Sequence, residues 1–391
     1  MAWFGRDRLF WVALLVVLCF VAVLILPSQS RASYPSYLLA ILMLATLPAW
    51  RDFFNLRIGW VLLCFLGWMA LSTFWSEDWT LRRSFSVWVR CLLVFLFVVA
   101  VAECRLRGQL QRWMARALTG AGVIVVLAAI GVFFWTDPED GRLNGLGQLD
   151  THVIAALVFG VVLLFVMRFV SDAQAKSWQR YLGVVIAVAI VMAIYLSDSR
   201  NAWVSVTGGA IVFLLAHKVQ DPKQFLAGVA GAGVLLVVML VMIANHDQLG
   251  PYLLPRGDSF RLLIWQEVIG RLDGHWLFGR GILTTDDVLQ GGIVFQHPHS
   301  MYLSVVYQAG IVGLVLFFTV LGWTIWTLMR HYYAADAKLA LSILALALSA
   351  YVLDGHELVD KVGSSWFLIW FPMAIAIGFR WAEPDAVEDE G

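Results

Sequence analysis

One stretch of the chain decides its fold class: His152-Val-Ile-Ala-Ala-Leu-Val-Phe-Gly-Val-Val-Leu-Leu-Phe-Val-Met-Arg-Phe-Val170. Its only formally charged residue is Arg168, close to the end of the stretch. An α-helix rises about 1.5 Å per residue, so about 20 apolar residues cross the hydrocarbon core of a bilayer. The stretch therefore predicts a membrane-spanning helix.

Stretches of the same kind recur along the chain, and the composition agrees with them. The 391 residues are 61% hydrophobic and 14% charged, which leaves too little polar surface for a soluble protein of this length. The sequence predicts an all-α integral membrane protein, a single polytopic domain over residues 1–391 with about 12 transmembrane helices. The expected spans are residues 9–26, 34–50, 58–74, 84–103, 117–135, 152–170, 181–197, 202–217, 225–244, 301–329, 338–353 and 364–380.

The distribution of Lys and Arg predicts the orientation of these spans. Positive charges gather in the short cytoplasmic loops of membrane proteins. If the N-terminus is cytoplasmic, the inside segments hold more Lys and Arg than the outside segments. We therefore expect both termini to be cytoplasmic and the long polar loop, residues 245–300, to lie outside. The acidic run Glu383–Glu390 is expected to be a solvated tail.

The long loop contains a further helical pattern. Within Ser259–Leu272, helical spacing places Leu262, Trp265, Ile269 and Leu272 on one face. This pattern predicts an amphipathic helix lying in the outer membrane interface.

The outer segments also carry arginines that suit a phosphate or diphosphate ligand. Arg200 lies in the short turn 197–203, Arg261 begins the predicted amphipathic helix, and Arg280 stands between two glycines. A guanidinium stays charged, and its fork of donors matches phosphate oxygens. Glycine lets the backbone approach a ligand closely. An arginine at the end of a span can equally serve as a headgroup anchor.

Two histidines and an arginine within an expected span complete the set of candidates. His297 and His299 precede the span at 301–329, where a histidine could exchange a proton near neutral pH. The same His-Pro-His run could instead serve only as a turn. Arg90 lies within the fourth expected span, where an arginine is costly unless it acts in function or pairs with a carboxylate. The four cysteines have no metal-type spacing, so no metal site is expected.

The order and spacing of these motifs resemble the O-antigen ligase and O-antigen polymerase superfamily of membrane glycosyltransferases. The matching elements are Arg261-Leu-Leu-Ile-Trp265, His275-Trp-Leu-Phe-Gly-Arg-Gly281, His299-Ser-Met-Tyr-Leu303, Gly310-Ile-Val-Gly313, Ser199-Arg-Asn-Ala-Trp203 and Phe74-Trp-Ser-Glu-Asp78. Two positions depart from the family pattern, since Ser300 replaces the usual Asn and Trp276 stands where Pro is common.

This resemblance implies a GT-C-like enzyme of the bacterial inner membrane with its active site facing the periplasm. The donor would be a glycan on undecaprenyl diphosphate, and the ligase branch would use a sugar hydroxyl of lipid A–core as acceptor. Neither a metal nor a nucleotide cofactor would be needed, and the anomeric centre would be inverted. By resemblance, His299 would be the general base, with His297 as its rival. Arg200, Arg261 and Arg280 would bind the diphosphate, with Arg90 as a further candidate.

Other functions fit parts of the sequence. An O-antigen polymerase would extend a lipid-linked glycan, but such enzymes tend to carry two substantial outer loops, and the second loop here, Thr136–Asp150, is short. A protein oligosaccharyltransferase commonly has an extra C-terminal soluble region, and the sequence shows no such region after the last expected span, so this function is less expected. A flippase or other transporter would place charges near the middle of the membrane. Here the cations concentrate at one face, with Arg90 as the exception.

Overall fold

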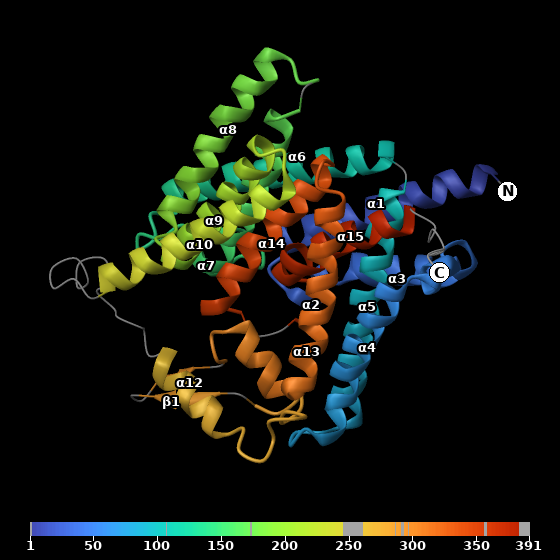
Figure 1. Ribbon diagram of the computed structural model, residues 1–391, viewed down its shortest axis with the longest axis vertical. Coiled ribbons are helices and arrows are strands. Elements are labelled where there is room, and N and C mark those ends of the chain that lie inside the picture. The colour runs from blue at the N-terminus through green and yellow to red at the C-terminus, as the bar shows by residue number, and fades with distance from the viewer. Residues whose placement is uncertain are drawn as a thin grey trace.

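Long helices account for most of the structure (Figure 1). The computed structural model describes residues 2–106, 108–172, 174–244, 261–285, 287–290, 293–295, 297–355 and 358–382. The helices are α1 (Ala2–Ile25), α2 (Gln29–Ala32), α3 (Tyr34–Ala45), α4 (Arg57–Leu71), α5 (Leu81–Arg105), α6 (Gly108–Thr136), α7 (His152–Val170), α8 (Ser177–Leu196), α9 (Arg200–Lys218), α10 (Pro222–Ala244), α12 (Arg261–Gly270), α13 (Met301–Arg330), α14 (Ala335–Leu353) and α15 (Phe371–Ala382). A short antiparallel hairpin joins β1 (Val288–Gln290) and β2 (Ile293–Phe295), with Val288 opposite Phe295.

Within the described residues, eight helices are long and apolar enough to cross a membrane: α1, α4, α5, α6, α7, α8, α13 and α14. The predicted span at 152–170 coincides with α7. The predicted span at 34–50 contains the 12-residue α3 followed by a 3-10 turn, and the span at 364–380 begins with a π-helical turn before α15. The helical, multi-pass character is therefore confirmed apart from the hairpin, whereas the exact number of spans stays a prediction.

Much of the outward surface of these helices is apolar. On α8, Tyr181 is 75% exposed, and Val185 and Val188 are each 65% exposed. Trp135, at the end of α6, is 90% exposed. Soluble proteins rarely present such continuous apolar faces, and lipid chains would cover them in a membrane. Cys64, on α4, is also exposed, while the other three cysteines are buried.

Contacts at one end of the bundle join the first and last helices. Arg8, on α1, donates from Nη1 to Oε1 of Glu103 near the end of α5, at 2.7 Å. Two residues further along α5, the guanidinium of Arg105 lies 3.3 Å from the ring centroid of Phe379 on α15. The start of α1 and the end of α15 thus lie at the same end of the bundle. That arrangement is the one expected if both termini are on one side of a membrane, although which side they face stays a prediction.

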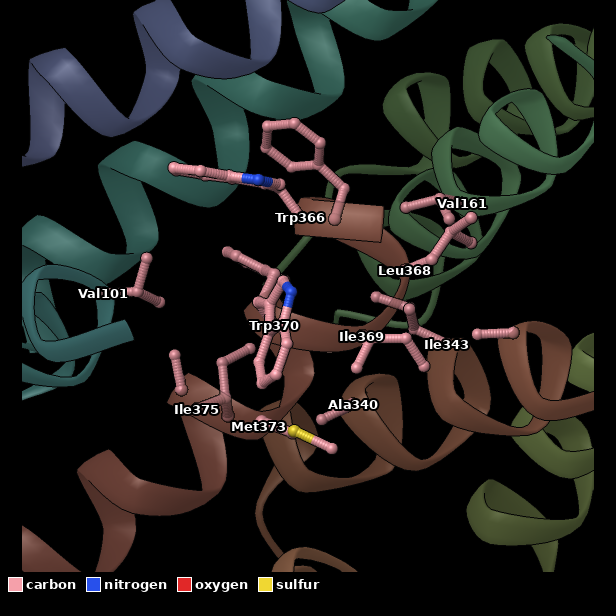
Figure 2. Packing of buried hydrophobic residues seen from close by; sticks show 14 of the residues in the cluster. Val101, Val161, Ala340, Ile343, Trp366, Leu368, Ile369, Trp370, Met373 and Ile375 are labelled. Carbon is pink, nitrogen blue, oxygen red and sulfur yellow. The ribbon is translucent and has the colours of Figure 1, made fainter. Parts of the chain in front are cut away.

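A π-helical turn, Trp366–Trp370, fills the centre of the bundle. Figure 2 shows its side chains between Val101 of α5, Val161 of α7 and Ile343 of α14. The five residues of the turn are buried, and Trp366 and Trp370 are among the largest fully buried side chains. The Trp370 indole N–H donates to the Leu358 carbonyl at 2.9 Å, which satisfies its polar group away from water. The segment between α14 and α15 is therefore fixed by packing.

α13 is interrupted at Gly310, where φ is 68° and ψ is −171°. A broken helix leaves peptide groups without helical partners, which is tolerated at membrane depth only if other groups pair with them. The turn at 276–281 supplies those partners. The bonds are Arg280 N–H to Tyr307 O (2.7 Å), Gly281 N–H to Gln308 O (3.0 Å), Ile311 N–H to Trp276 O (2.9 Å) and Val312 N–H to Leu277 O (3.3 Å). The turn is therefore locked into the break by backbone bonds on both sides.

Glycine is required on both sides of this contact, in the turn at 276–281 and at the break in α13. Gly279 and Gly310 each have a positive φ, and a Cβ on Gly279 would lie 2.5 Å from the Gly310 nitrogen. A Cβ on Gly310 would overlap the Leu277 carbonyl. The glycines of the two sequence motifs thus permit a close approach of two backbones.

The described part of the long loop, with α12 and the β1–β2 hairpin, lies beside the start of α13, away from α8 (Figure 1). α12 spans Arg261–Gly270. Ile264, Val268 and Leu272 are buried against Tyr307 of α13, whereas Leu262 and Ile269 are 56% and 42% exposed. Apart from Leu272, α12 therefore packs on protein with other residues than those of the predicted apolar face, and the placement of that face in the membrane interface stays a prediction. Residues 245–260 of the loop and the expected acidic tail Glu383–Glu390 lie outside the described residues.

Candidate functional site

His299 and Asp354 come together from two separate elements. His299 lies two residues before α13 and has a positive φ of 52°, which turns the chain sharply into the helix. Asp354 is the residue that follows α14. The His299 Nδ1 atom lies 3.7 Å from Oδ1 of Asp354, and the side chains are 30% and 19% exposed. A carboxylate beside an imidazole orients the ring and stabilises its protonated form.

The surroundings of Asp354 keep its carboxyl ionised. Burial alone would raise the pKa of Asp354, but hydrogen bonds from His299 and from the Gly355 backbone N–H, together with nearby histidine charge, bring the pKa below its usual value. The carboxylate is therefore negative at neutral pH, in the state that can support a protonated His299.

His297 has a different geometry from His299. Its Nδ1 atom accepts a hydrogen bond from the backbone N–H of His299 at 3.2 Å. The two rings are 4.1 Å apart between centroids. This bond stabilises the turn that carries His299, so the geometry favours His299 over its rival as the base and gives His297 a role in holding the turn.

Arg261 lies at the same end of α14 as the His299–Asp354 pair. Its Nε atom donates to the carbonyl of Leu353, the residue before Asp354, at 3.1 Å. Arg261 and His299 therefore contact adjacent residues at the end of α14, Leu353 and Asp354.

Arg200 is the first residue of α9, and its side chain is exposed. The next residue, Asn201, donates to the Ala350 carbonyl of α14 at 3.1 Å. Ser199 caps α9 by accepting from the Ala202 N–H at 3.3 Å, which explains the serine of the sequence motif. The start of α9 thus also lies beside the end of α14.

Arg280 is held by a different set of residues. Its Nη1 atom donates to the Arg271 carbonyl at 2.9 Å, and its Nη2 atom pairs with the Glu77 carboxylate. The described contacts tie Arg280 to the connection between α4 and α5, whereas Arg261 and His299 contact the end of α14. That the three arginines converge with His299 on one substrate stays a prediction.

The segment after Arg280 is fastened to the connection between α4 and α5. The bonds are Ile282 N–H to Ser72 Oγ (3.2 Å), Leu283 N–H to Ser76 Oγ (3.1 Å), Glu77 N–H to Thr284 Oγ1 (3.0 Å) and Thr285 Oγ1 to Asp78 Oδ2 (3.1 Å). The motif Phe74–Asp78 therefore has a structural role, because its bonds fix the backbone segment that follows Arg280.

Two cavities of opposite character lie at this end of the bundle. The acidic cavity, about 150 Å³, has Asp354, Asp360, His297, Gln29 and Gln148 among its lining residues. The basic cavity, about 430 Å³, is lined by Arg83, Ser86, Val87, Arg90, Ile282, Leu283, Thr284, Thr285, Asp287 and Gln308.

Arg90 connects the two cavities. Its Nη1 atom lies 3.4 Å from Oδ1 of Asp360, and the two side chains are 24% and 19% exposed. Arg90 lines the basic cavity and Asp360 lines the acidic one, so this ion pair stands where the cavities adjoin. The carboxylate partner that the sequence could only suggest for Arg90 is therefore Asp360.

Sequence reasoning missed Asp354, Asp360, Glu77 and Gln148. Asp354, Asp360 and Gln148 belong to no motif, and Glu77 occupies the variable position of its motif. The partners of the three acids lie far away in sequence. The only available signal was the position of Asp354 directly after an apolar stretch, next to Gly355. In the described part of the chain, no group of three or more His, Cys, Asp or Glu side chains is placed to hold a metal ion.

Known proteins show similarity to this chain, and the matched family region includes Arg200, Arg261, Arg280 and His299. Residues 185–318 match the O-antigen ligase family. An O-antigen ligase of Pseudomonas aeruginosa is 26% identical over 320 residues, covering 80% of this chain and 75% of that protein. A protein of Rickettsia conorii, named for a proposed polysaccharide ligase activity, is 20% identical over 284 residues, covering 68% of this chain and 67% of that protein.

Proposed function

The comparisons confirm the predicted resemblance and support the O-antigen ligase family for this chain, and from that premise we propose that it transfers a glycan from undecaprenyl diphosphate to a sugar hydroxyl of lipid A–core. Its relatives imply a glycosyltransferase-like enzyme, and its apolar helices make it a multi-pass membrane protein. In this proposal, the reaction takes place at the periplasmic face of the inner membrane.

The observation that carries the proposal is the His299–Asp354 pair at one end of the bundle. The Nδ1 atom of His299 faces Asp354, so Nε2 is the atom that takes the proton from the acceptor hydroxyl. The hydroxyl oxygen forms a bond to the anomeric carbon as the bond from that carbon to the diphosphate oxygen breaks. The electron pair leaves with undecaprenyl diphosphate. Because the hydroxyl attacks the face of the anomeric carbon opposite the diphosphate, the anomeric centre is inverted.

The arginines act on the leaving group. Arg200, Arg261 and Arg280 bind the diphosphate and stabilise the negative charge that grows on it as the glycosidic bond breaks. The diphosphate is already an activated leaving group, so the proposal requires neither nucleotide nor metal. Because Glu77 pairs with Arg280, this carboxylate holds the guanidinium in place until the donor binds.

The test is transfer by the purified full-length protein in EDTA and without nucleotide. The substrates are an undecaprenyl-diphosphate glycan, purified lipid A–core, and both together. Glycosylated lipid A–core supports the ligase. A longer lipid-linked glycan with unmodified lipid A–core identifies a polymerase instead. If neither product forms while vesicles containing the protein move the lipid-linked glycan across the bilayer, the chain is a transporter and the proposal is wrong.

A further inference from the structure

The acidic cavity is formed where the ends of several helices meet beside the His299–Asp354 pair. Val23 of α1, Ile154 of α7, Met301 of α13 and Asp354 after α14 all line it. Asp354 therefore contacts His299 and also forms part of the cavity wall. A molecule in this cavity therefore lies against the carboxylate that pairs with the proposed base.

The loop between α6 and α7 is docked so that it places Gln148 in this cavity. The Gln148 backbone N–H donates to the Val23 carbonyl at 3.3 Å, and Leu149 is fully buried. Gly147 has a positive φ of 63°, and a Cβ there would lie 2.7 Å from the backbone of Ile25. The loop is thus fixed against the end of α1 by a close backbone contact that only glycine permits.

The Gln148 side chain lacks a protein partner for its amide nitrogen. Among the described residues, its Nε2 atom is buried and has no hydrogen-bond partner. Buried polar atoms in folded proteins are nearly always hydrogen-bonded, to the protein, to water or to a ligand. An amide nitrogen that lines a cavity in this state is therefore a donor available to an oxygen of a bound molecule.

The charges of the cavity indicate what kind of molecule that is. Asp354 and Asp360 present carboxylates, which accept hydrogen bonds from hydroxyl groups and repel phosphate. Gln29, which bonds Asp360 at 3.4 Å, Gln148 and Ser365 add further hydrogen-bonding groups. Leu149, Ile154 and Leu368 form an apolar part of the wall. Hydroxyl-binding groups beside an apolar surface suit a sugar ring, which has polar edges and C–H faces.

We propose that the acidic cavity binds the acceptor sugar whose hydroxyl His299 deprotonates, and this inference rests on the proposed glycosyl transfer. At about 30 Å³ per water in the liquid, a cavity of about 150 Å³ holds about five waters, which is room for about one sugar ring and not for an oligosaccharide. The terminal sugar of the acceptor enters this cavity, and the diphosphate of the donor stays with the arginines.

The test measures initial rates of transfer by the full-length protein with Gln148→Leu, varying one substrate at a time. The matched control is Asn144→Leu, an exposed residue of the same loop that does not line the cavity. Losing one hydrogen bond costs about 0.5–1.5 kcal/mol, so the KM for lipid A–core should rise about 2-fold to 13-fold. The KM for the donor should not change, and Asn144→Leu should match wild type for both substrates.

A second measurement guards against a folding defect in Gln148→Leu. A photo-crosslinking amino acid at position 148 should attach covalently to lipid A–core, and the same residue at position 144 should not. An unchanged acceptor KM without crosslinking would show that the cavity holds only water, and a rise in the donor KM alone would assign it to the donor. Either result overturns the inference.

The outcomes separate this inference from the proposed function. If wild type extends the lipid-linked glycan and leaves lipid A–core unmodified, the ligase proposal fails. The role of the acidic cavity is then tested by the effect of Gln148→Leu on the KM for the acceptor that wild type uses. If wild type transfers to no acceptor at all, both proposals are wrong.

Discussion

The two cavities that adjoin at the Arg90–Asp360 pair differ in charge. The acidic cavity has Asp354, Asp360 and two glutamines in its wall, and the basic cavity has Arg83, Arg90 and the hydroxyls of Thr284 and Thr285. Hydroxyl-rich sugars suit the first set of groups, and phosphate oxygens suit the second. Arg90 and Asp360 separate the two.

This difference addresses a problem that any transferase of this kind faces. Both substrates are amphiphiles held in the same membrane, and only one of them carries the diphosphate that leaves. Opposite charges on the two sides of the Arg90–Asp360 pair would direct the anionic donor away from the place of the acceptor. Ile282–Thr285, which follow Arg280, form part of the wall of the basic cavity, whereas Arg200 and Arg261 lie at the end of α14.

The largest effect is expected at the base. In His299→Ala, transfer should fall by about 10²–10⁴ because no positioned group accepts the acceptor proton. His297→Ala is the matched control, and it should retain more than a tenth of wild-type activity because that side chain stabilises the turn and lines the acidic cavity without taking the proton. Initial rates at saturating substrates measure both. A larger loss in His297→Ala than in His299→Ala would contradict the assignment.

The next effect concerns the carboxylate that connects the base with the acidic cavity. Asp354→Asn keeps the shape of the side chain and removes its charge, which costs about 1.5–3 kcal/mol for a hydrogen bond to a charged group. That corresponds to a fall of about 10-fold to 150-fold in kcat. The loss should fall mainly on kcat, since Asp354 acts by orienting His299. A change in KM alone, with normal kcat, would mean that Asp354 only contacts the acceptor.

A smaller effect should follow from disturbing the junction that supports Arg280. In Gly310→Ala, a Cβ would meet the Leu277 carbonyl at a positive φ, which should destabilise the protein by about 1–3 kcal/mol. Gly322→Ala on the same helix is the control, because no atom lies within 4 Å of the added Cβ. Thermal unfolding in detergent measures both. Equal stability of the two variants would show that the break in α13 is not needed.

The smallest effect is expected at Glu77. Its carboxylate is 61% exposed, so its pair with Arg280 should contribute less than about 1 kcal/mol. In Glu77→Gln, the KM for the donor should change by less than about 5-fold, while the KM for lipid A–core should stay as in wild type. A change confined to the KM for lipid A–core would place Arg280 on the acceptor side and contradict the proposed division between donor and acceptor sites.

The helices and the main motif residues could be predicted from the sequence for clear physical reasons. Backbone groups in lipid must pair within the segment, so each span appears as a long apolar run such as 152–170. Arg261 and His299 could be predicted because they belong to motifs whose order is recognisable. Their common neighbour at the end of α14 could not, since Asp354 is an isolated acid whose partner lies on another helix.

Two other features lay beyond sequence reasoning for different reasons. The buried face of α12 could not be decided by periodicity, because apolar residues occupy both of its sides and packing against Tyr307 selects Ile264 and Val268. From the sequence, the loop between α6 and α7 is informative only by its short length, yet its docking against α1 brings Gln148 into the acidic cavity. Length gives no indication of which side chain a loop buries.

The most direct test of the division between donor and acceptor is a cryo-electron microscopy structure of the wild-type protein with undecaprenyl diphosphate. The account predicts density for the diphosphate against the guanidinium groups of Arg200, Arg261 and Arg280, with the acidic cavity free of it. Density for the diphosphate inside the acidic cavity, against Gln148 and Asp360, would contradict the account.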